Sequence, residues 1–379
     1  MFGKKTRICR FWRDKIKKKG EKMDRKIGVL TFHRTSNFGS SLQAYGLYEK
    51  IRDLGYSCEI IDYRCPAIEK RENLKPELRL SDPKGIVRQC LYGPAIKRKA
   101  QKLEQFGKEK MMLSKPYEPD NIGEAEPDYS KIIVGSDIVW GRDITEDDYT
   151  YFLDFVRDDF KKYAFSSSVG NCDIRENEEK LSGLLKSFQR IAVREDEAVS
   201  WVRKISGREA EQVCDPTLLL TTEEWERAIP PSSYPEDDYV LVYFDSDDHK
   251  CLHDAISYAK ANNKKVYYIN YYRPAKNAKN VKPTSLEQFL GLIKHASMVF
   301  TASYHGMLFS IYFHRQFFFY TRAHKSRVIS LAKRLGVLDR CGDELDVRAC
   351  EKIDYASVDR KLQDFRHESV MVLKEMLNA

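Results

Sequence analysis

A histidine and an arginine, each placed where a predicted strand ends, are the strongest candidates for chemistry in this sequence. His305 follows the apolar run 298–302 and begins a predicted helix, where exposed backbone N–H groups bind anions and a histidine can exchange protons near neutral pH. Arg194 follows the apolar run 190–193, and its planar guanidinium suits a carboxylate or a phosphate. The alternatives are a structural histidine at the first position and, for the arginine, an ion pair with a nearby acid such as Glu195.

The loop between a first predicted strand (27–32) and a first predicted helix (41–55) offers small side chains and free backbone N–H groups. This arrangement at the start of a helix favours an anion or a sugar hydroxyl. The alternative is an ordinary polar loop in which a serine caps the helix. The residues that we expect to bind substrate here are Asn37, Gly39 and Ser40.

A second polar loop follows the predicted strand 131–134. Gly135 allows the chain to turn sharply, and we expect the adjacent Ser136 to bind substrate. Asp137 can accept hydrogen bonds from sugar hydroxyls or act as a base, and Trp140 can give an apolar platform for a sugar ring. The alternatives are that Asp137 caps a helix and that Trp140 belongs to the core.

These loops belong to two series of alternating strands and helices. Strand-length apolar runs alternate with helical patterns over residues 27–228 and again over residues 239–320, which predicts parallel sheets with helices on their faces. Residues 230–235 are rich in proline and serine, which predicts a linker. We therefore expect an α/β protein of two facing Rossmann-like domains, over residues 23–230 and 231–379, the second one ending in a closing C-terminal helix.

Two parts of the first series give less regular patterns. Residues 152–155 carry two phenylalanines and a leucine around Asp154, and we expect a strand there. Residues 66–128 are polar and carry prolines, and we expect them to form an excursion over the active-site edge. A basic helix is predicted within that excursion, over residues 96–112.

The net charge of +8 belongs to the N-terminal tail. Residues 1–22 carry ten basic and two acidic residues, so the rest of the chain is neutral overall, which argues against a nucleic-acid-binding surface. In the tail, Ile8, Phe11 and Ile16 recur at helical spacing, which suits a basic amphipathic helix on an anionic membrane. The alternatives are a disordered, solvated extension and a true start of the protein at Met23.

Metal-binding, disulfide and membrane-spanning patterns are missing from the sequence. The nine cysteines form no C-x-x-C pair and have no histidine at zinc-finger spacing, which indicates free thiols in a reducing cytoplasm. No apolar run reaches the length of a transmembrane helix, and the N-terminus lacks the pattern of a signal peptide. We therefore expect a cytoplasmic protein, in contact with the inner membrane face if the tail binds it.

Several short segments, taken in order along the chain, form a combined pattern. They are GVLTFHRTSNFGSSLQAYGL, IIVGSDIVW, YFLDFV, IAVRE, VCDPTLLL, TASYHGMLFSIYF and SRVISLAKRLGVLDR. Together they resemble the polysaccharide pyruvyl transferase family over about residues 26–340, and the resemblance implies a glycosyltransferase-B-like fold. It also implies transfer of pyruvate from phosphoenolpyruvate onto two hydroxyls of a sugar as a cyclic ketal, in the synthesis of bacterial capsule or exopolysaccharide.

The resemblance also assigns roles to single residues. It implies that the histidine and the arginine of the family's phosphoenolpyruvate site fall on His305 and Arg194, and that a basic residue of that site falls near Lys325, with Arg327 close by. The sequence departs from the commoner family pattern at Ala302, where an acid is frequent, and in having a tyrosine before the histidine, where phenylalanine is usual. The other residues expected around phosphoenolpyruvate are Ser303, Tyr304 and Gly306.

Phosphoenolpyruvate is then the co-substrate, and we expect neither a metal ion nor a separate cofactor, because protein cations can neutralise the phosphate. We expect His305 to act as the acid and Asp137 to orient or deprotonate a sugar or lipid-linked oligosaccharide that approaches from the loops around Asn37 and Trp140. Two other functions stay open: a nucleotide-sugar-dependent glycosyltransferase of the same fold and a catalytically silent scaffold for envelope assembly.

Overall fold

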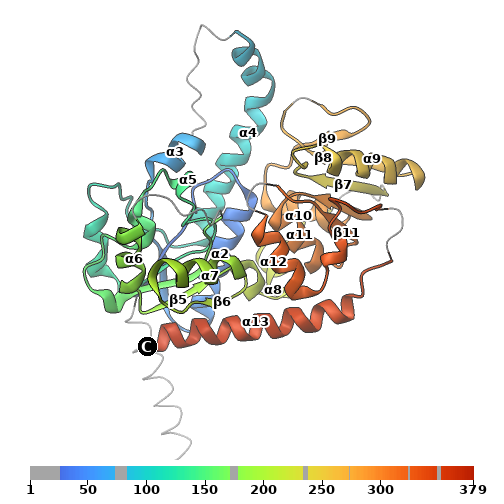
Figure 1. Ribbon diagram of the computed structural model, residues 1–379. Coiled ribbons are helices and arrows are strands. Elements are labelled where there is room, and N and C mark those ends of the chain that lie inside the picture. Colours follow the sequence, from blue (N-terminus) through green and yellow to red (C-terminus); the bar gives the residue numbers. More distant parts are fainter. Residues whose placement is uncertain are drawn as a thin grey trace, which may run out of the picture.

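The computed structural model contains two parallel β-sheets, each covered by helices (Figure 1). The N-terminal tail, with its predicted membrane helix, lies outside the described residues. The helices and strands between the described ends follow the order that the alternating sequence patterns predict, with the exceptions given below. The residues that the structure describes are 26–72, 83–170, 178–233, 238–272, 274–322, 325–347 and 351–379.

The first sheet has the strand order β2-β1-β3-β4-β5-β6, and all its neighbouring strands pair in parallel. The strands β1, β3, β4 and β5 are almost fully buried because helices cover both faces of the sheet, which explains why they are mostly apolar in the sequence, whereas β6 at the edge is polar and partly exposed. The strands are β1 (Lys26–Leu30), β2 (Ser57–Ile60), β3 (Lys131–Val134), β4 (Lys162–Ser167), β5 (Arg190–Val193) and β6 (Glu211–Gln212). The main helices are α2 (Phe38–Asp53), α3 (Pro66–Glu72), α4 (Pro83–Lys110), α6 (Glu178–Ser187), α7 (Asp196–Ser206) and α8 (Thr222–Ala228).

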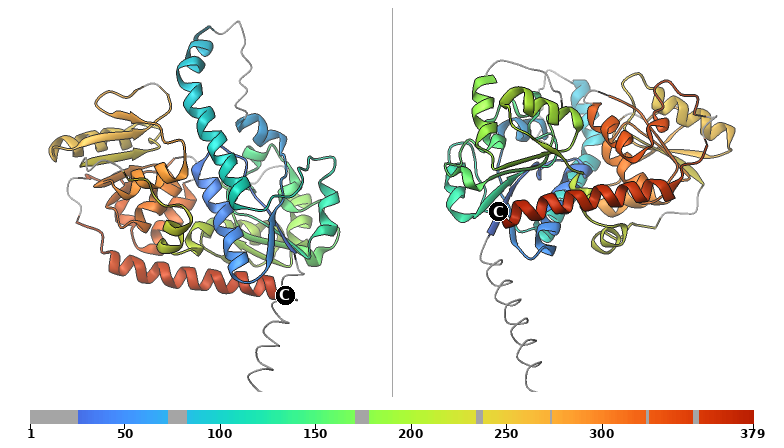
Figure 2. Two further views of the ribbon diagram at one scale, coloured as in Figure 1. Left: turned by 180° about the vertical axis from the view of Figure 1, so that it is seen from behind. Right: turned by 60° about the horizontal axis from the view of Figure 1, so that its bottom comes forward.

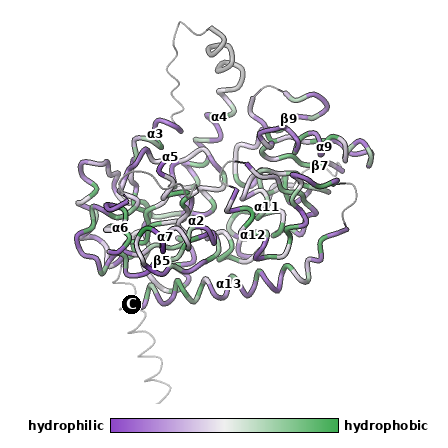
Figure 3. The backbone as a smooth tube through the Cα atoms, viewed as in Figure 1, coloured by the Kyte–Doolittle hydropathy of each residue, from purple (hydrophilic) through white to green (hydrophobic). Residues whose placement is uncertain are grey.

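The second sheet has the order β11-β10-β7-β8-β9 and is also parallel throughout. Figure 3 shows that hydrophobic segments gather around the two sheets, while hydrophilic segments lie at the periphery. The strands are β7 (Tyr239–Tyr243), β8 (Lys265–Ile269), β9 (Lys279–Val281), β10 (Met298–Thr301) and β11 (Phe317–Phe319). The helices are α9 (Lys250–Ala261), α10 (Leu286–Lys294), α11 (Tyr304–Tyr312) and α12 (Ser326–Leu335).

The two halves share one apolar cluster, which fixes the start of α2 against the second sheet's helices. Phe38, the first residue of α2, stacks on Phe289 of α10 with ring centres 4.6 Å apart. Trp225 of α8 packs edge-on against Phe309 of α11 at 5.7 Å. Aromatic contacts of this kind bury large areas, so they hold the strand-end loops of both sheets in a fixed relation.

The last helix, α13 (Tyr355–Asn378), runs from the second half of the molecule back to the first (Figures 1 and 2). Near its end, Ser369 Oγ accepts a hydrogen bond of 2.8 Å from the backbone N of Cys214, and Asn378 accepts one of 2.8 Å from the Tyr56 hydroxyl. The predicted closing helix is therefore present and ties both halves together. The predicted division at residues 230 and 231 stays a prediction.

Two expectations about single segments need correction. Residues 149–152 form a 3-10 helix instead of the start of a strand at 152–155, because Leu153 takes a left-handed conformation with a φ of 55° that ends extended pairing. The helix expected over residues 96–112 is longer, since α4 begins at Pro83, and it stands beside α2 (Figure 1). Among the described residues, no helix is both long and apolar enough to cross a membrane.

Candidate active site

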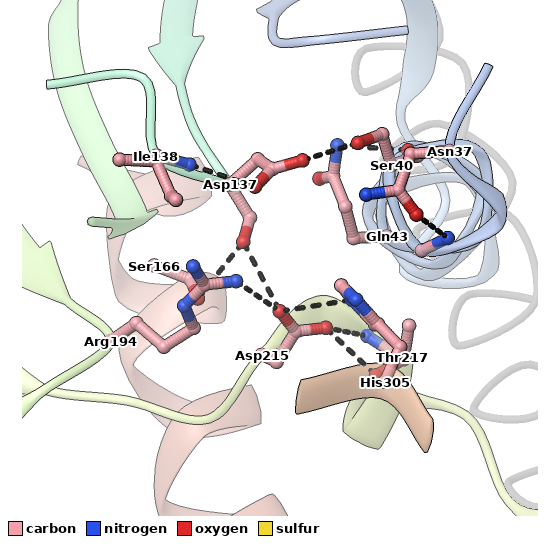
Figure 4. A network of polar contacts seen from close by, with 12 residues as sticks. Asn37, Ser40, Gln43, Asp137, Ile138, Ser166, Arg194, Asp215, Thr217 and His305 are labelled. Carbon is pink, nitrogen blue, oxygen red and sulfur yellow. Dashed lines mark hydrogen bonds and ion pairs between the residues drawn. The ribbon is translucent and has the colours of Figure 1, made fainter. Parts of the chain in front are cut away.

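Side chains from the carboxyl ends of strands in both sheets meet in one buried polar cluster (Figure 4). Arg194 follows β5 and Asp137 follows β3 in the first sheet, while His305 lies in the first turn of α11, after β10 of the second sheet. The carboxyl edge of parallel strands is where such folds bind ligands. The structure thus brings the three predicted catalytic residues together.

Arg194 is buried, positively charged and only partly hydrogen-bonded. Its Nη1 lies 2.7 Å from Asp215 Oδ2, and its guanidinium carbon lies 4.8 Å from the ring centre of Tyr304. Burial alone would lower the pKa of this guanidinium, but Asp215 and the Tyr304 and Glu195 groups raise it, so the charge is kept. Its Nε and Nη2 atoms are buried and have no hydrogen-bond partner among the described residues. Unpaired buried donors on a charged group favour an anionic ligand.

The sequence also allowed Arg194 to serve only in an ion pair with a nearby acid. In the structure, an ion pair uses one edge of its guanidinium and not the other. One edge of the guanidinium is held by Asp215, and Glu195 Oε2 lies farther away, at 3.9 Å from Nε. The Glu195 carboxylate is fully buried, and its Oε1 accepts hydrogen bonds from Ser168 Oγ at 2.8 Å and from the backbone N of Val169 at 3.0 Å. The ion pair thus orients the arginine and leaves two of its nitrogens free.

Asp215 joins the arginine to the histidine, and the sequence reasoning missed it. Its Oδ1 accepts hydrogen bonds from Thr217 N (2.9 Å) and Thr217 Oγ1 (2.7 Å), so the carboxylate cannot rotate freely. Its Oδ2 faces Arg194, Ser136 Oγ at 3.5 Å and His305 Nε2 at 3.8 Å. Asp215 lies three residues after the end of β6, and an acid in the turn that follows a strand of a parallel sheet was the available signal.

Burial alone would raise the pKa of the Asp215 carboxyl, but the contact with His305 and the charge of Arg194 lower it well below the ordinary value of 3.8. Its ionised form therefore stabilises the fold in full above that value, and this contribution is lost as the pH falls below it. We expect Asp215→Asn to be less stable than the wild type at neutral pH but to lose less further stability between about pH 5 and about pH 3. Chemical denaturation at several pH values measures this, and parallel acid limbs for the two proteins would contradict it.

His305 is held between the two halves of the molecule. It is 6% exposed, and its Nε2 has no hydrogen-bond partner among the described residues. On the other side, a Cβ atom built on Gly39 would lie 2.0 Å from His305 Nδ1, so only glycine fits beside the imidazole. Gly39, expected to bind substrate, thus positions the histidine by allowing the start of α2 to approach the start of α11.

Asp137 and Ser40 form the part of the cluster next to the start of α2. Asp137 has a φ of 73°, in the left-handed region, and its Oδ2 accepts a hydrogen bond of 2.5 Å from Ser40 Oγ. Its Oδ1 accepts one of 2.9 Å from the backbone N of Ile138. The cap of α2 is Asn37, whose Oδ1 accepts from Gly39 N at 2.9 Å, instead of a serine. Asp137 is thus fixed in orientation beside the arginine whose charge it affects.

The start of α11 is held by its own residues. Ser303 caps this helix and accepts a hydrogen bond of 3.2 Å from the backbone N of Gly306. A Cβ atom on Gly306 would lie 2.4 Å from Thr301 Oγ1, so the glycine allows α11 to pack on β10. Tyr304 is buried beneath the Arg194 guanidinium. These three residues support the site, and their contact with a substrate stays a prediction.

The start of α12 adds a second guanidinium. Ser326 Oγ and Arg327 Nε are buried and have no hydrogen-bond partner in the part of the chain that the structure describes. Burial and the charge of Arg194 lower the pKa of Arg327, so the two guanidinium groups are near enough to repel each other. The predicted Lys325 is exposed just before the helix. Sequence reasoning did not single out Ser326 as a site residue, although it begins the segment SRVISLAKRLGVLDR.

Trp140 is not a platform for a sugar ring, and this prediction was wrong. The side chain is 2% exposed, and its Nε1 donates a hydrogen bond of 2.8 Å to the carbonyl of Tyr151. Its ring stacks on Phe152 with centres 5.3 Å apart. The tryptophan therefore belongs to the core, as the alternative had it, because its polar atom finds a partner only in the interior.

A family model described as polysaccharide pyruvyl transferase matches residues 37–324, which is most of the chain. No curated protein matches the sequence.

Among the described residues, no group of three or more His, Cys, Asp or Glu side chains could hold a metal ion.

Solved structures with a similar outline include three proteins of low sequence identity. A UDP-GlcNAc 2-epimerase from Methanocaldococcus jannaschii is 8% identical, with a TM-score of 0.43 over 89% of this chain and 92% of that one. Arabidopsis thaliana UGT89C1, complexed with UDP-L-rhamnose, is 8% identical, with a TM-score of 0.44 over 93% and 99%. A UDP-N-acetylglucosamine 2-epimerase from Rickettsia bellii is 7% identical, with a TM-score of 0.40 over 93% and 98%. At these scores the likeness says nothing about activity.

Proposed function

Because this chain belongs to the polysaccharide pyruvyl transferase family, and is therefore a transferase, we propose that it moves pyruvate from phosphoenolpyruvate onto two hydroxyls of one sugar as a cyclic ketal. The observation that carries the proposal is the set of buried N–H donors on Arg194 and Arg327 that have no hydrogen-bond partner among the described residues, with Arg194 and His305 both facing Asp215. Phosphoenolpyruvate carries a carboxylate and a phosphate on the same carbon. Two guanidinium groups match such a pair of planar and tetrahedral anions.

The reaction balances without a further reactant. A proton adds to the methylene carbon of phosphoenolpyruvate, which becomes a methyl group and leaves the central carbon electrophilic. One sugar hydroxyl adds to that carbon, the second closes the ring, and the C–O bond to phosphate breaks. Of the two hydroxyl protons, one replaces the proton given to the methyl group and the other leaves with phosphate. No separate cofactor takes part in this scheme.

The residues supply the proton transfers and the charge stabilisation. His305 donates the proton to the methylene carbon, because its Nε2 is buried, has no hydrogen-bond partner among the described residues and lies 3.8 Å from the Asp215 carboxylate. Asp137 receives the hydroxyl proton or orients the acceptor, and its bond to Ser40 keeps it in place. Arg194 and Arg327 hold the anionic groups and stabilise the leaving phosphate. The product in this proposal is a pyruvylated bacterial surface polysaccharide, such as capsule or exopolysaccharide.

Phosphate release from phosphoenolpyruvate by the purified protein tests the proposal. The assay is run with and without galactose-, glucose- and mannosamine-type acceptors, including lipid-linked ones. We expect release that depends on an acceptor and that falls at least 100-fold in His305→Ala. Release in that variant at the wild-type rate would contradict the role of the histidine. Tight binding of a nucleotide sugar, together with no binding of phosphoenolpyruvate, would instead support a conventional glycosyltransferase.

We further propose that the protein works in the cytoplasm at the inner membrane face, where a lipid-linked acceptor would be concentrated near it. The basis is the basic tail 1–22, which carries the whole net charge of the chain. The full chain is expected to sediment with vesicles that contain anionic lipid, and the chain lacking residues 1–22 is expected to stay in the supernatant. Equal sedimentation of both would contradict the proposal.

A further inference from the structure

A polar cavity lies beside the active-site cluster and takes no part in the scheme above. Its volume is about 730 Å³, which is within the range of small-molecule sites and large enough for more than one sugar ring. It lies where the loop after β1 meets α3 and the second half of α4. The lining residues include His33, Arg34, Ser36, Asp62, Arg64 and Glu69.

The charged side chains of this cavity are largely paired with one another. Asp62 accepts from Arg64 at 3.0 and 2.8 Å and lies 3.0 Å from His33 Nε2. Arg34 Nε donates to Glu69 at 3.0 Å. The contact with His33 and the hydrogen bonds and charge of Arg64 outweigh burial and hold the pKa of Asp62 well below its usual range, so this acid stays ionised. Because the acidic and basic side chains of the wall neutralise one another, the wall has no surplus charge to attract a polyanion. Its hydrogen-bonding groups suit a neutral ligand with several hydroxyls better.

The cavity also has an apolar part, which a sugar ring requires for its C–H face. Ala100, Leu103 and Gly107 of α4 line one side, and Leu113 lines another. Leu103 is 3% exposed and belongs to the main apolar cluster, so this side is rigid. The combination of polar edges and an apolar wall is typical of sites that bind uncharged ligands.

The position of the cavity relative to His305 follows from the chain itself. Ser36 lines the cavity, and Gly39 touches the His305 imidazole. Three peptide units separate these residues, so their Cα atoms are at most about 11 Å apart. The edge of the cavity that Ser36 forms therefore lies within about 11 Å of the residue that contacts the imidazole.

We propose that this cavity binds the acceptor as an uncharged sugar or oligosaccharide end, with its reacting hydroxyls turned toward Asp137 and His305. The proposal rests on the proposed function and gives it an acceptor site, in place of the surface around Trp140 that the sequence suggested. Recognition comes from the paired groups around Asp62 and from the apolar wall of α4.

Filling the cavity tests the proposal. Ala100→Trp places a large side chain on the cavity wall, while Lys102→Trp places the same side chain on an exposed position of the same helix that does not line the cavity. We expect Ala100→Trp to raise the KM for the acceptor at least tenfold and to leave the KM for phosphoenolpyruvate unchanged. Lys102→Trp is expected to change neither. An acceptor KM in Ala100→Trp equal to that of the control would overturn the proposal.

A binding measurement keeps this test independent of the reaction. Saturation-transfer NMR is recorded with galactose-, glucose- and N-acetylmannosamine-terminated disaccharides and each of the three proteins. Signals in the wild type and in Lys102→Trp, but not in Ala100→Trp, would support a sugar site in the cavity even if no phosphate were released from phosphoenolpyruvate. Equal signals in both variants, or none in the wild type, would overturn it.

Discussion

Replacing Arg194 with lysine is expected to weaken the binding of phosphoenolpyruvate at least 100-fold while the protein stays folded. Lysine can still pair with the buried Asp215 carboxylate. The variant therefore avoids the cost of about 3–5 kcal/mol that follows when one partner of a buried ion pair is removed. It cannot replace the two N–H groups of Nε and Nη2 that have no partner in the structure. Each hydrogen bond between charged groups contributes about 1.5–3 kcal/mol, so losing two costs about 3 kcal/mol or more.

The matched control is Arg203→Lys on α7, where the arginine is exposed and pairs with Glu209. Calorimetric titration with phosphoenolpyruvate compares the two variants with the wild type, and thermal denaturation confirms that each is folded. Binding by Arg194→Lys within about threefold of the control would mean that the free nitrogens of this arginine do not hold the ligand.

Gly39→Ala is expected to lower kcat/KM at least 100-fold through His305. The added Cβ would lie 2.0 Å from His305 Nδ1 and 2.5 Å from its Cγ, so the ring has to move. A displacement of about 1 Å can cost about 100-fold in rate when a catalytic group must meet its target atom. The helix itself should tolerate the change, because alanine is a better helix former than glycine.

Gly183→Ala in α6 is the matched control, since nothing lies within 4 Å of a Cβ built there. It is expected to keep full activity and to gain up to about 1 kcal/mol in the free energy of unfolding. Steady-state kinetics and circular dichroism of both variants make the comparison. An active Gly39→Ala protein would show that the position of His305 is not set by the start of α2.

Local patterns predicted the secondary structure well where an apolar run and a capped helix follow each other. The apolar run 298–302 predicted a strand followed by a helix, and the structure has β10 over Met298–Thr301 and α11 from Tyr304, with Ser303 as its cap. Residues 152–155 were predicted wrongly because the same aromatic composition fits a buried 3-10 turn. The mistake about Trp140 has the same cause, since its type does not tell whether its ring points to the core or to solvent.

The cluster itself depended on contacts that no local pattern contains. Arg194 and Asp215 meet because β5 and β6 pair side by side, and Gly39 meets His305 because the two halves pack together. Arg194, Asp137 and His305 could be predicted because each follows a strand, and ligands of such folds bind at the carboxyl ends of the strands. This reasoning did not find the carboxylate that links the arginine to the histidine, which appears only once the sheet is assembled.

The most direct measurement is NMR of the product formed from phosphoenolpyruvate labelled with ¹³C at the methylene carbon, incubated with the protein and the acceptor panel. We expect the label to appear as a methyl group on a ketal carbon bonded to two oxygens of one sugar, with one phosphate released for each ketal. We also expect this signal to be much weaker with Arg194→Lys. Label found only in free pyruvate, or unchanged phosphoenolpyruvate with every acceptor, would contradict the proposed reaction.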